Sequence, residues 1–184
     1  MDPLEATGQM SHAVGLLTVI GAECSGKSTL CSALGRALDA PVVPEYLRLW
    51  CEREGRTPRR DEQRHIIAGQ LALTRAAIAR ARADGLRWVI SDGAPILTAA
   101  YSIEYFRDHT LIAKGLRHAR ASARIIVADP TIPWVPDERL RDGPSHRESV
   151  HRTLLQLLQR EALDWQLVSG PPTQRLRDCL ALVR

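Results

Sequence analysis

The chain has 184 residues, of which 45% are hydrophobic and 25% charged, a composition that indicates one globular domain and excludes a disordered chain. The net charge of +4 comes from arginine, because only two lysines occur, and the absence of basic runs together with 4% aromatic residues argues against a nucleic-acid partner. The longest apolar run is much shorter than a membrane span, and the first residues are acidic where a signal peptide carries basic ones. We therefore expect a cytoplasmic protein with reduced cysteines and no membrane partner.

Strand and helix patterns alternate along the chain. A continuous apolar run predicts a buried strand at 14–20, and an apolar stripe with helical spacing predicts a helix at 27–38. The remaining predicted elements are, in order, a strand at 41–45, a helix at 61–83, a strand at 86–90, helices at 95–106 and 111–119, a strand at 124–127, a helix at 148–162, a strand at 166–168 and a helix at 173–183. This order predicts one α/β domain over 13–184, with a five-stranded parallel sheet covered by helices on both faces, after a flexible tail at 1–12.

The turn after the first strand carries the clearest motif. Residues 21–28 read GAECSGKS and match the P-loop pattern G-x-x-x-x-G-K-[ST] in full. In this pattern the backbone N–H groups point at phosphate oxygens, the lysine reaches the outer phosphates, and the last hydroxyl binds Mg²⁺. We therefore expect ATP and Mg²⁺ as cofactors. The nucleotide-binding residues are predicted to be Gly21, Glu23, Cys24, Ser25, Gly26, Lys27, Ser28 and Thr29.

Acidic residues follow three other strands at the same edge of the sheet, where ligands bind in such folds. Glu45 is placed to take a proton from an attacking hydroxyl, although a surface loop acid is the alternative. Asp92 is a candidate for the Mg²⁺ shell together with Ser28, and capping the next helix is its alternative role. Asp129 is a second candidate for the Mg²⁺ shell, or a turn residue before Pro130, and the sequence does not decide between the two acids.

Arginines crowd the irregular segment before the helix at 148–162. Arg139 and Arg141 are predicted to belong to a lid that closes over the triphosphate and neutralises charge during transfer, with a solvated basic surface as the alternative. Aromatic residues near Glu45 and after Asp92, Tyr101 among them, can stack on a planar ring, although most aromatic residues serve the core.

Three classes of P-loop protein remain after these observations. The chain contains no asparagine, so the Asn-Lys-x-Asp signature that reads guanine is absent. The first reading is a kinase acting on a small hydroxyl acceptor. The second is an ATP-dependent switch or binding protein without such an acceptor, and acceptor-dependent ATP consumption distinguishes it from the first. The third, an oligonucleotide kinase, is disfavoured because no basic tail occurs.

Several motifs in order resemble one family. GAECSGKSTL, PEYLR, Gly69–Gln70, ISDGAPILTAAYS and ADPTIPWVPDERLRDG resemble the kinase domain of NadR-type proteins and their stand-alone AAA-type ATPase/kinase relatives, over about 15–183. The resemblance implies a fold of the nucleoside and nucleoside-monophosphate kinase type with a mobile lid, and phosphorylation of nicotinamide riboside in NAD salvage. It places Glu45, Tyr46 and Arg48 near the acceptor, and Trp134, Asp137 and Arg141 in the lid. Cys24, Leu47 and Glu138–Arg139 depart from the family pattern, and the His-x-Gly-His motif of an adenylyltransferase module is absent.

Overall fold

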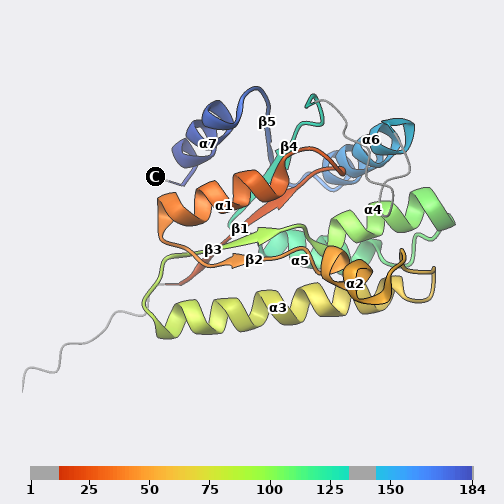
Figure 1. The fold of residues 1–184 in the computed structure, drawn as a ribbon, viewed down its shortest axis with the longest axis horizontal. Coiled ribbons are helices and arrows are strands. Elements are labelled where there is room, and N and C mark those ends of the chain that lie inside the picture. Colours follow the sequence, from red (N-terminus) through yellow and green to blue (C-terminus); the bar gives the residue numbers. More distant parts are fainter. Residues whose placement is uncertain (1–12, 133–143, 184) are drawn as a thin grey trace, which may run out of the picture.

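The computed structural model describes residues 13–132 and 144–183, which form one α/β domain (Figure 1). The strands are β1 (Gly15–Ile20), β2 (Val42–Val43), β3 (Trp88–Asp92), β4 (Arg124–Ala128) and β5 (Gln166–Val168). The helices are α1 (Lys27–Leu38), α2 (Tyr46–Glu54), α3 (Gln63–Ala83), α4 (Pro95–Phe106), α5 (Ile112–Ala121), α6 (Pro144–Arg160) and α7 (Pro172–Ala181). The predicted tail and the predicted lid residues Trp134, Asp137, Arg139 and Arg141 lie outside the described residues.

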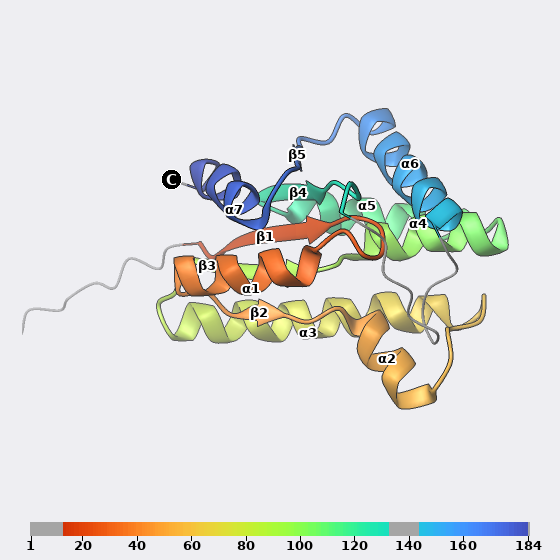
Figure 2. The ribbon, with the colours of Figure 1, turned by 45° about the horizontal axis from the view of Figure 1, so that its top comes forward.

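The five strands form one parallel sheet in the order β2-β3-β1-β4-β5, which confirms the predicted architecture. Side chains alternate across the central strand β1. Leu17 and Val19 pack toward α1 and α7, which lie side by side (Figure 2), while Leu16 and Ile20 face the helices on the opposite side. Since both faces are covered, the central strand β1 is almost entirely apolar and buried.

Most predicted elements are found with shifted bounds, and two helices differ most from the sequence prediction. Helix α2 was not predicted. Only Trp50 and Cys51 of this helix are buried, so its sequence shows mainly charged residues and no clear apolar stripe. Helix α6 begins at Pro144, before the predicted position 148, so that His146 and Arg147 belong to a helix and not to an irregular segment. Proline suits a first helical turn because its missing N–H has no partner there.

Strand β1 lies between β3 and β4, and it is therefore the point at which the strand order reverses. Ligands in open parallel sheets bind outside the carboxyl ends of the strands at such a point. In Figure 1 the end of β2 leads to α2, and the end of β3 leads to the start of α4. Among the described residues no helix has the length and apolarity needed to cross a membrane.

A buried histidine gives the fold a pH dependence. His118 of α5 is 8% exposed, and neither ring nitrogen has a hydrogen-bond partner in the described part of the chain. Burial lowers its pKa from 6.5 to about 4. Between these values the unfolded chain binds a proton that the folded chain excludes. The free energy of unfolding is therefore expected to fall as the pH decreases, by at most about 1.4 kcal/mol per pH unit from this group.

Denaturant unfolding between about pH 7.5 and pH 5 measures this slope. The variant His118→Leu should flatten it, whereas His65→Leu, at an exposed position of α3, should leave it unchanged. Burial also lowers the pKa of His151, so part of the slope should survive in the His118 variant. Equal slopes in the wild type and His118→Leu would contradict the assignment.

Candidate active site

The P-loop joins the carboxyl end of β1 to the start of α1. Gly21 has φ 151°, and a Cβ atom there would lie 2.7 Å from the carbonyl oxygen of Ala128 at the end of β4. Gly26 has φ 79°, and α1 begins at the next residue without a side-chain cap. Glycine is thus required at both positions. Because α1 starts directly after the loop, the N–H groups of its first turn belong to the same loop end, as a phosphate-binding turn needs.

Lys27 directs its ammonium group over this loop. The side chain is only 6% exposed, and Nζ donates a hydrogen bond to the carbonyl oxygen of Ala22 at 3.1 Å. Lys27 also lines a cavity in front of the loop. The ammonium group is thus held between the backbone of the P-loop and an open space, which is where a γ-phosphate of a nucleotide on the loop would meet a second substrate.

Two carboxylates lie close to Lys27 at the ends of β2 and β3. Glu45 packs against Gly93, where a Cβ atom would lie 3.3 Å from Cγ of Glu45. Burial raises the pKa of Glu45 above its usual value, the charge of Lys27 opposes this shift, and the charge of Asp92 adds to it. Asp92 is 5% exposed, and its Oδ1 atom has no hydrogen-bond partner within the described residues. A raised pKa suits a proton acceptor, and a buried oxygen without a partner suits a cation shell.

Gln70 of α3 fixes the turn that carries Glu45. Its Oε1 accepts a hydrogen bond from the backbone N–H of Tyr46 at 2.7 Å, and its Nε2 donates to the Pro44 carbonyl oxygen at 3.3 Å. The same amide donates to Oγ of Ser91, next to Asp92, at 3.3 Å. One buried amide therefore holds the two carboxylate-bearing segments together.

Tyr46 packs away from the cavity. A Cβ atom at Gly69 would lie 2.2 Å from its ring, so the ring occupies the space that this glycine leaves on α3. The ring belongs to the cluster around Trp50, and Tyr46 is not among the residues that line the cavity. Its predicted contact with the acceptor stays a prediction, while its packing explains why glycine precedes Gln70.

The cavity in front of Lys27 has a volume of about 410 Å³. It extends from the P-loop to the loop between α2 and α3, and α4 contributes three aromatic rings. Its lining residues are Glu23, Cys24, Lys27, Glu45, Leu47, Arg48, Cys51, Thr57, Pro58, Arg59, Gln63, Tyr101, Tyr105 and Phe106. Tyr101 stacks on Tyr105, with ring centroids 6.1 Å apart. This is the size and mixed character of a site for one small molecule with a flat, partly apolar group.

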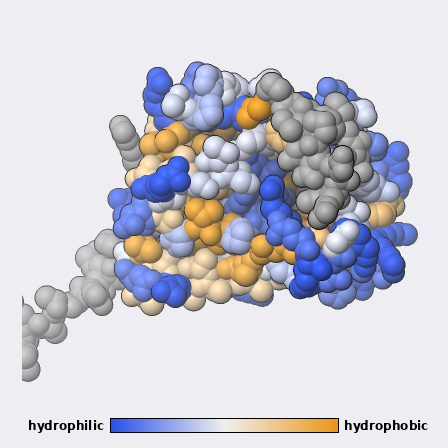
Figure 3. Space-filling model, in the orientation of Figure 1, coloured by the Kyte–Doolittle hydropathy of each residue, from blue (hydrophilic) through white to orange (hydrophobic). Residues whose placement is uncertain are grey.

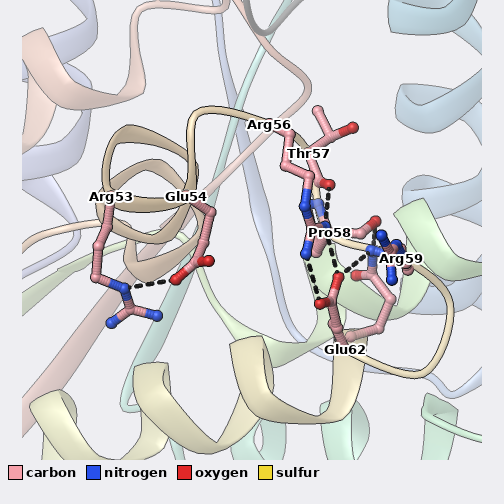
Figure 4. Close-up of polar contacts among 8 residues, drawn as sticks. Arg53, Glu54, Arg56, Thr57, Pro58, Arg59 and Glu62 are labelled. Carbon is pink, nitrogen blue, oxygen red and sulfur yellow. Dashed lines mark hydrogen bonds and ion pairs between the residues drawn. The ribbon is translucent and has the colours of Figure 1, made fainter.

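The far wall of the cavity is a braced loop. Glu62 accepts hydrogen bonds from both terminal nitrogens of Arg56 at 2.8 Å and from the backbone N–H of Arg59 at 2.7 Å, as Figure 4 shows. Arg56 also lies over the ring of Trp50, 5.0 Å from its centroid. Hydrophilic residues gather over α2 and this loop on the face that Figure 3 shows. The loop is thus ordered by its own contacts before any ligand binds.

The structure brings most of the predicted site residues together. Glu23, Cys24, Lys27, Glu45, Arg48 and Tyr101 line one cavity, and Asp92 lies beside Glu45. Gly21, Ser25, Gly26 and Ser28 belong to the P-loop or to the first turn of α1, and Thr29 is exposed on that turn. Asp129 is engaged elsewhere, because its Oδ1 accepts a hydrogen bond from the backbone N–H of Thr131 at 3.0 Å.

Sequence reasoning missed two kinds of residue. Phe106, Gln63 and Arg59 line the cavity although no motif marks them. Arg175 contacts the P-loop from α7, far away in the sequence. A weak signal did exist for this arginine, because it occupies the inward face of an amphipathic helix one turn before the buried Cys179.

Comparisons with known proteins agree with this architecture. A family model described as an AAA domain matches residues 16–175. A structure of NadR protein in complex with NR has a TM-score of 0.78 and 21% identity, covering 94% of this chain and 51% of that chain. A structure of NadR protein in complex with NAD and AMP-PNP has a TM-score of 0.74 and 22% sequence identity. The match covers 93% of this chain and 49% of that chain. A structure of deoxyadenosine kinase from M. mycoides has a TM-score of 0.64 and 12% sequence identity. The match covers 91% of this chain and 98% of that chain.

The chain spans about half the length of the NadR chains. No curated protein matches its sequence. At these identities the likeness is one of fold.

Proposed function

Because this chain belongs to the AAA domain family, we propose that it is an ATP-dependent kinase that transfers the γ-phosphoryl group to a nucleoside hydroxyl, with nicotinamide riboside as the first candidate. One observation carries the proposal. The P-loop lysine lies between the nucleotide-binding loop and a second cavity that also contains Glu45 and aromatic rings. A switch that only binds ATP needs no second cavity at this place.

The proposed reaction is a direct transfer. The acceptor oxygen forms a bond to the γ-phosphorus, the bond from this phosphorus to the bridging oxygen of ADP breaks, and the hydroxyl proton moves to the Glu45 carboxylate. Lys27 lies beside the charge that develops on the transferred group. Burial supports the role of Glu45 because it raises the pKa of this residue, so that the carboxylate binds a proton more readily than an exposed glutamate.

Mg²⁺ fits the residues that are present. Ser28 and Asp92 would hold it, together with phosphate oxygens and water, and the buried Oδ1 atom of Asp92 has no other partner among the described residues. The described residues contain no group of three or more His, Cys, Asp or Glu side chains that could bind a metal ion alone, and Mg²⁺ on a nucleotide does not require one. When bound, the ion neutralises charge on the phosphates. Since Asp129 already accepts a turn hydrogen bond, Asp92 is our choice between the two acids.

The acceptor proposal rests on the aromatic wall of the cavity. A pyridinium ring against Tyr101 would gain about 0.5–2 kcal/mol from cation–π attraction, which a neutral ring lacks. The NadR structure in complex with NR points to the same acceptor. Arg48 and Arg59 at the same cavity can bind the ribose hydroxyls or a polar substituent of the ring.

A panel of acceptors tests this proposal. We expect kcat/KM with ATP and Mg²⁺ to be highest for nicotinamide riboside among nicotinamide riboside, uridine, cytidine and thymidine. Tyr101→Leu should reduce the preference for the charged ring, whereas Tyr101→Phe, which keeps the ring face, should retain most of it. A higher kcat/KM for a neutral nucleoside than for nicotinamide riboside would contradict the proposed acceptor but not the proposed kinase activity. The absence of any acceptor-dependent ATP consumption would favour the switch.

A further inference from the structure

Arg175 of α7 binds three backbone segments at once. Its NH1 donates a hydrogen bond to the carbonyl oxygen of Ser25 in the P-loop at 2.7 Å. Its NH2 donates to the Asp129 carbonyl oxygen after β4 at 3.0 Å, and its Nε donates to the Gly170 carbonyl oxygen after β5 at 2.8 Å. The residue is 2% exposed. One planar guanidinium therefore connects the P-loop with the ends of the two strands beyond it.

The Arg175 guanidinium forms no ion pair within the described residues. The arginines that form ion pairs in the described part of the chain are Arg53, Arg56, Arg60, Arg80 and Arg120, and each of them is substantially exposed. No described carboxylate oxygen lies within 4.0 Å of the Arg175 guanidinium. Burial lowers the pKa of this group, with the charge of Asp129 opposing the shift. Three carbonyl oxygens accept hydrogen bonds from the guanidinium, which is therefore held beside the loop without a direct ion pair among the described residues.

The P-loop is close to this charge at the turn that opens α1. A Cβ atom at Gly26 would lie 3.9 Å from NH1 of Arg175, and the next residue is Lys27. Arg175 thus lies against the turn that opens α1, next to the residue before Lys27. An anion on the loop would therefore lie near two positively charged side chains, those of Lys27 and Arg175.

We propose that Arg175 is a positioning residue for the bound triphosphate: it fixes the Ser25–Gly26 turn against the ends of β4 and β5, and its buried charge favours the phosphates electrostatically. The inference rests on the proposed binding of ATP to the P-loop. It assigns nucleotide affinity to a residue of the last helix, which no motif includes. A purely structural brace would stabilise the fold and leave the affinity of folded protein unchanged.

Equilibrium binding of AMP-PNP with Mg²⁺, measured per folded molecule, separates the two roles. Arg175→Met should weaken binding by about 10–100-fold, because it removes a buried positive charge near the phosphates and releases the turn that binds them. Arg175→Lys keeps the charge but cannot reach three carbonyl groups in a plane, so its loss should be smaller than that of Arg175→Met. In turnover, KM for ATP should rise while kcat at saturating ATP and KM for the acceptor change little.

Arg177→Met is the matched control, because Arg177 lies on the same helix and is exposed. It removes the same charge and should leave affinity within about twofold of wild type. Affinity of Arg175→Met equal to that of Arg177→Met, even with a lower melting temperature, would overturn the proposal. Equal losses of AMP-PNP affinity in Arg175→Lys and Arg175→Met would contradict the electrostatic part of the proposal. Failure of the wild type to bind AMP-PNP would instead overturn the proposed function.

Discussion

Replacing Lys27 with alanine is expected to reduce phosphoryl transfer at least about 100-fold and to weaken ATP binding. The side chain is buried between the P-loop backbone and the acceptor cavity, where its ammonium group lies closest to the predicted position of the γ-phosphate. No other lysine can replace it, because Lys114, the second lysine of the chain, lies on α5 and is exposed. Steady-state turnover and equilibrium ATP binding measure the two effects separately.

Lys114→Ala is the natural control and should behave like the wild type. It changes the net charge by the same amount, so a shared effect would indicate a general response to charge. Turnover above about a tenth of the wild-type rate in Lys27→Ala would remove the P-loop assignment.

Replacing Glu45 with glutamine is expected to lower kcat by about 10²–10⁴ with little change in ATP binding. The change keeps the size of the side chain and removes only its ability to take the acceptor proton. Burial raises the pKa of Glu45, so the acid limb of kcat/KM should lie above the usual value of 4.5 in the wild type and disappear in the variant. Rates fall on the acidic side because a protonated Glu45 cannot accept the proton. A pH–rate profile of both proteins measures this.

Two further variants make the assignment sharper. Glu52→Gln, at an exposed position of the neighbouring helix α2, should retain the wild-type rate and its acid limb. Asp92→Asn should raise the Mg²⁺ concentration needed for half-maximal activity, because Asp92 is the proposed ligand. If Glu45→Gln changes the Mg²⁺ requirement and Asp92→Asn removes the acid limb, then the roles of the two carboxylates are reversed.

The amino-acid sequence by itself determined the architecture and the position of the P-loop in it. A continuous apolar run predicted β1, and a helical apolar stripe predicted α1, since both signals arise within a few residues. The P-loop could be identified for the same reason, because Gly21, Gly26 and Lys27 act through the local backbone path. The residues after each strand could be assigned to one edge, because parallel strands end on the same side.

Only the tertiary structure decided which side chains complete the site. Gln70 contacts Ser91 and Arg175 contacts Ser25 across 21 and 150 residues of sequence, and no local pattern encodes such pairs. The same holds for the aromatic residues. Tyr101 lines the cavity while Tyr46 fills the space at Gly69, although both follow strand ends in the sequence. Their roles depend on how α2, α3 and α4 pack against one another, and this packing is set by the combined burial of many side chains and not by any one segment.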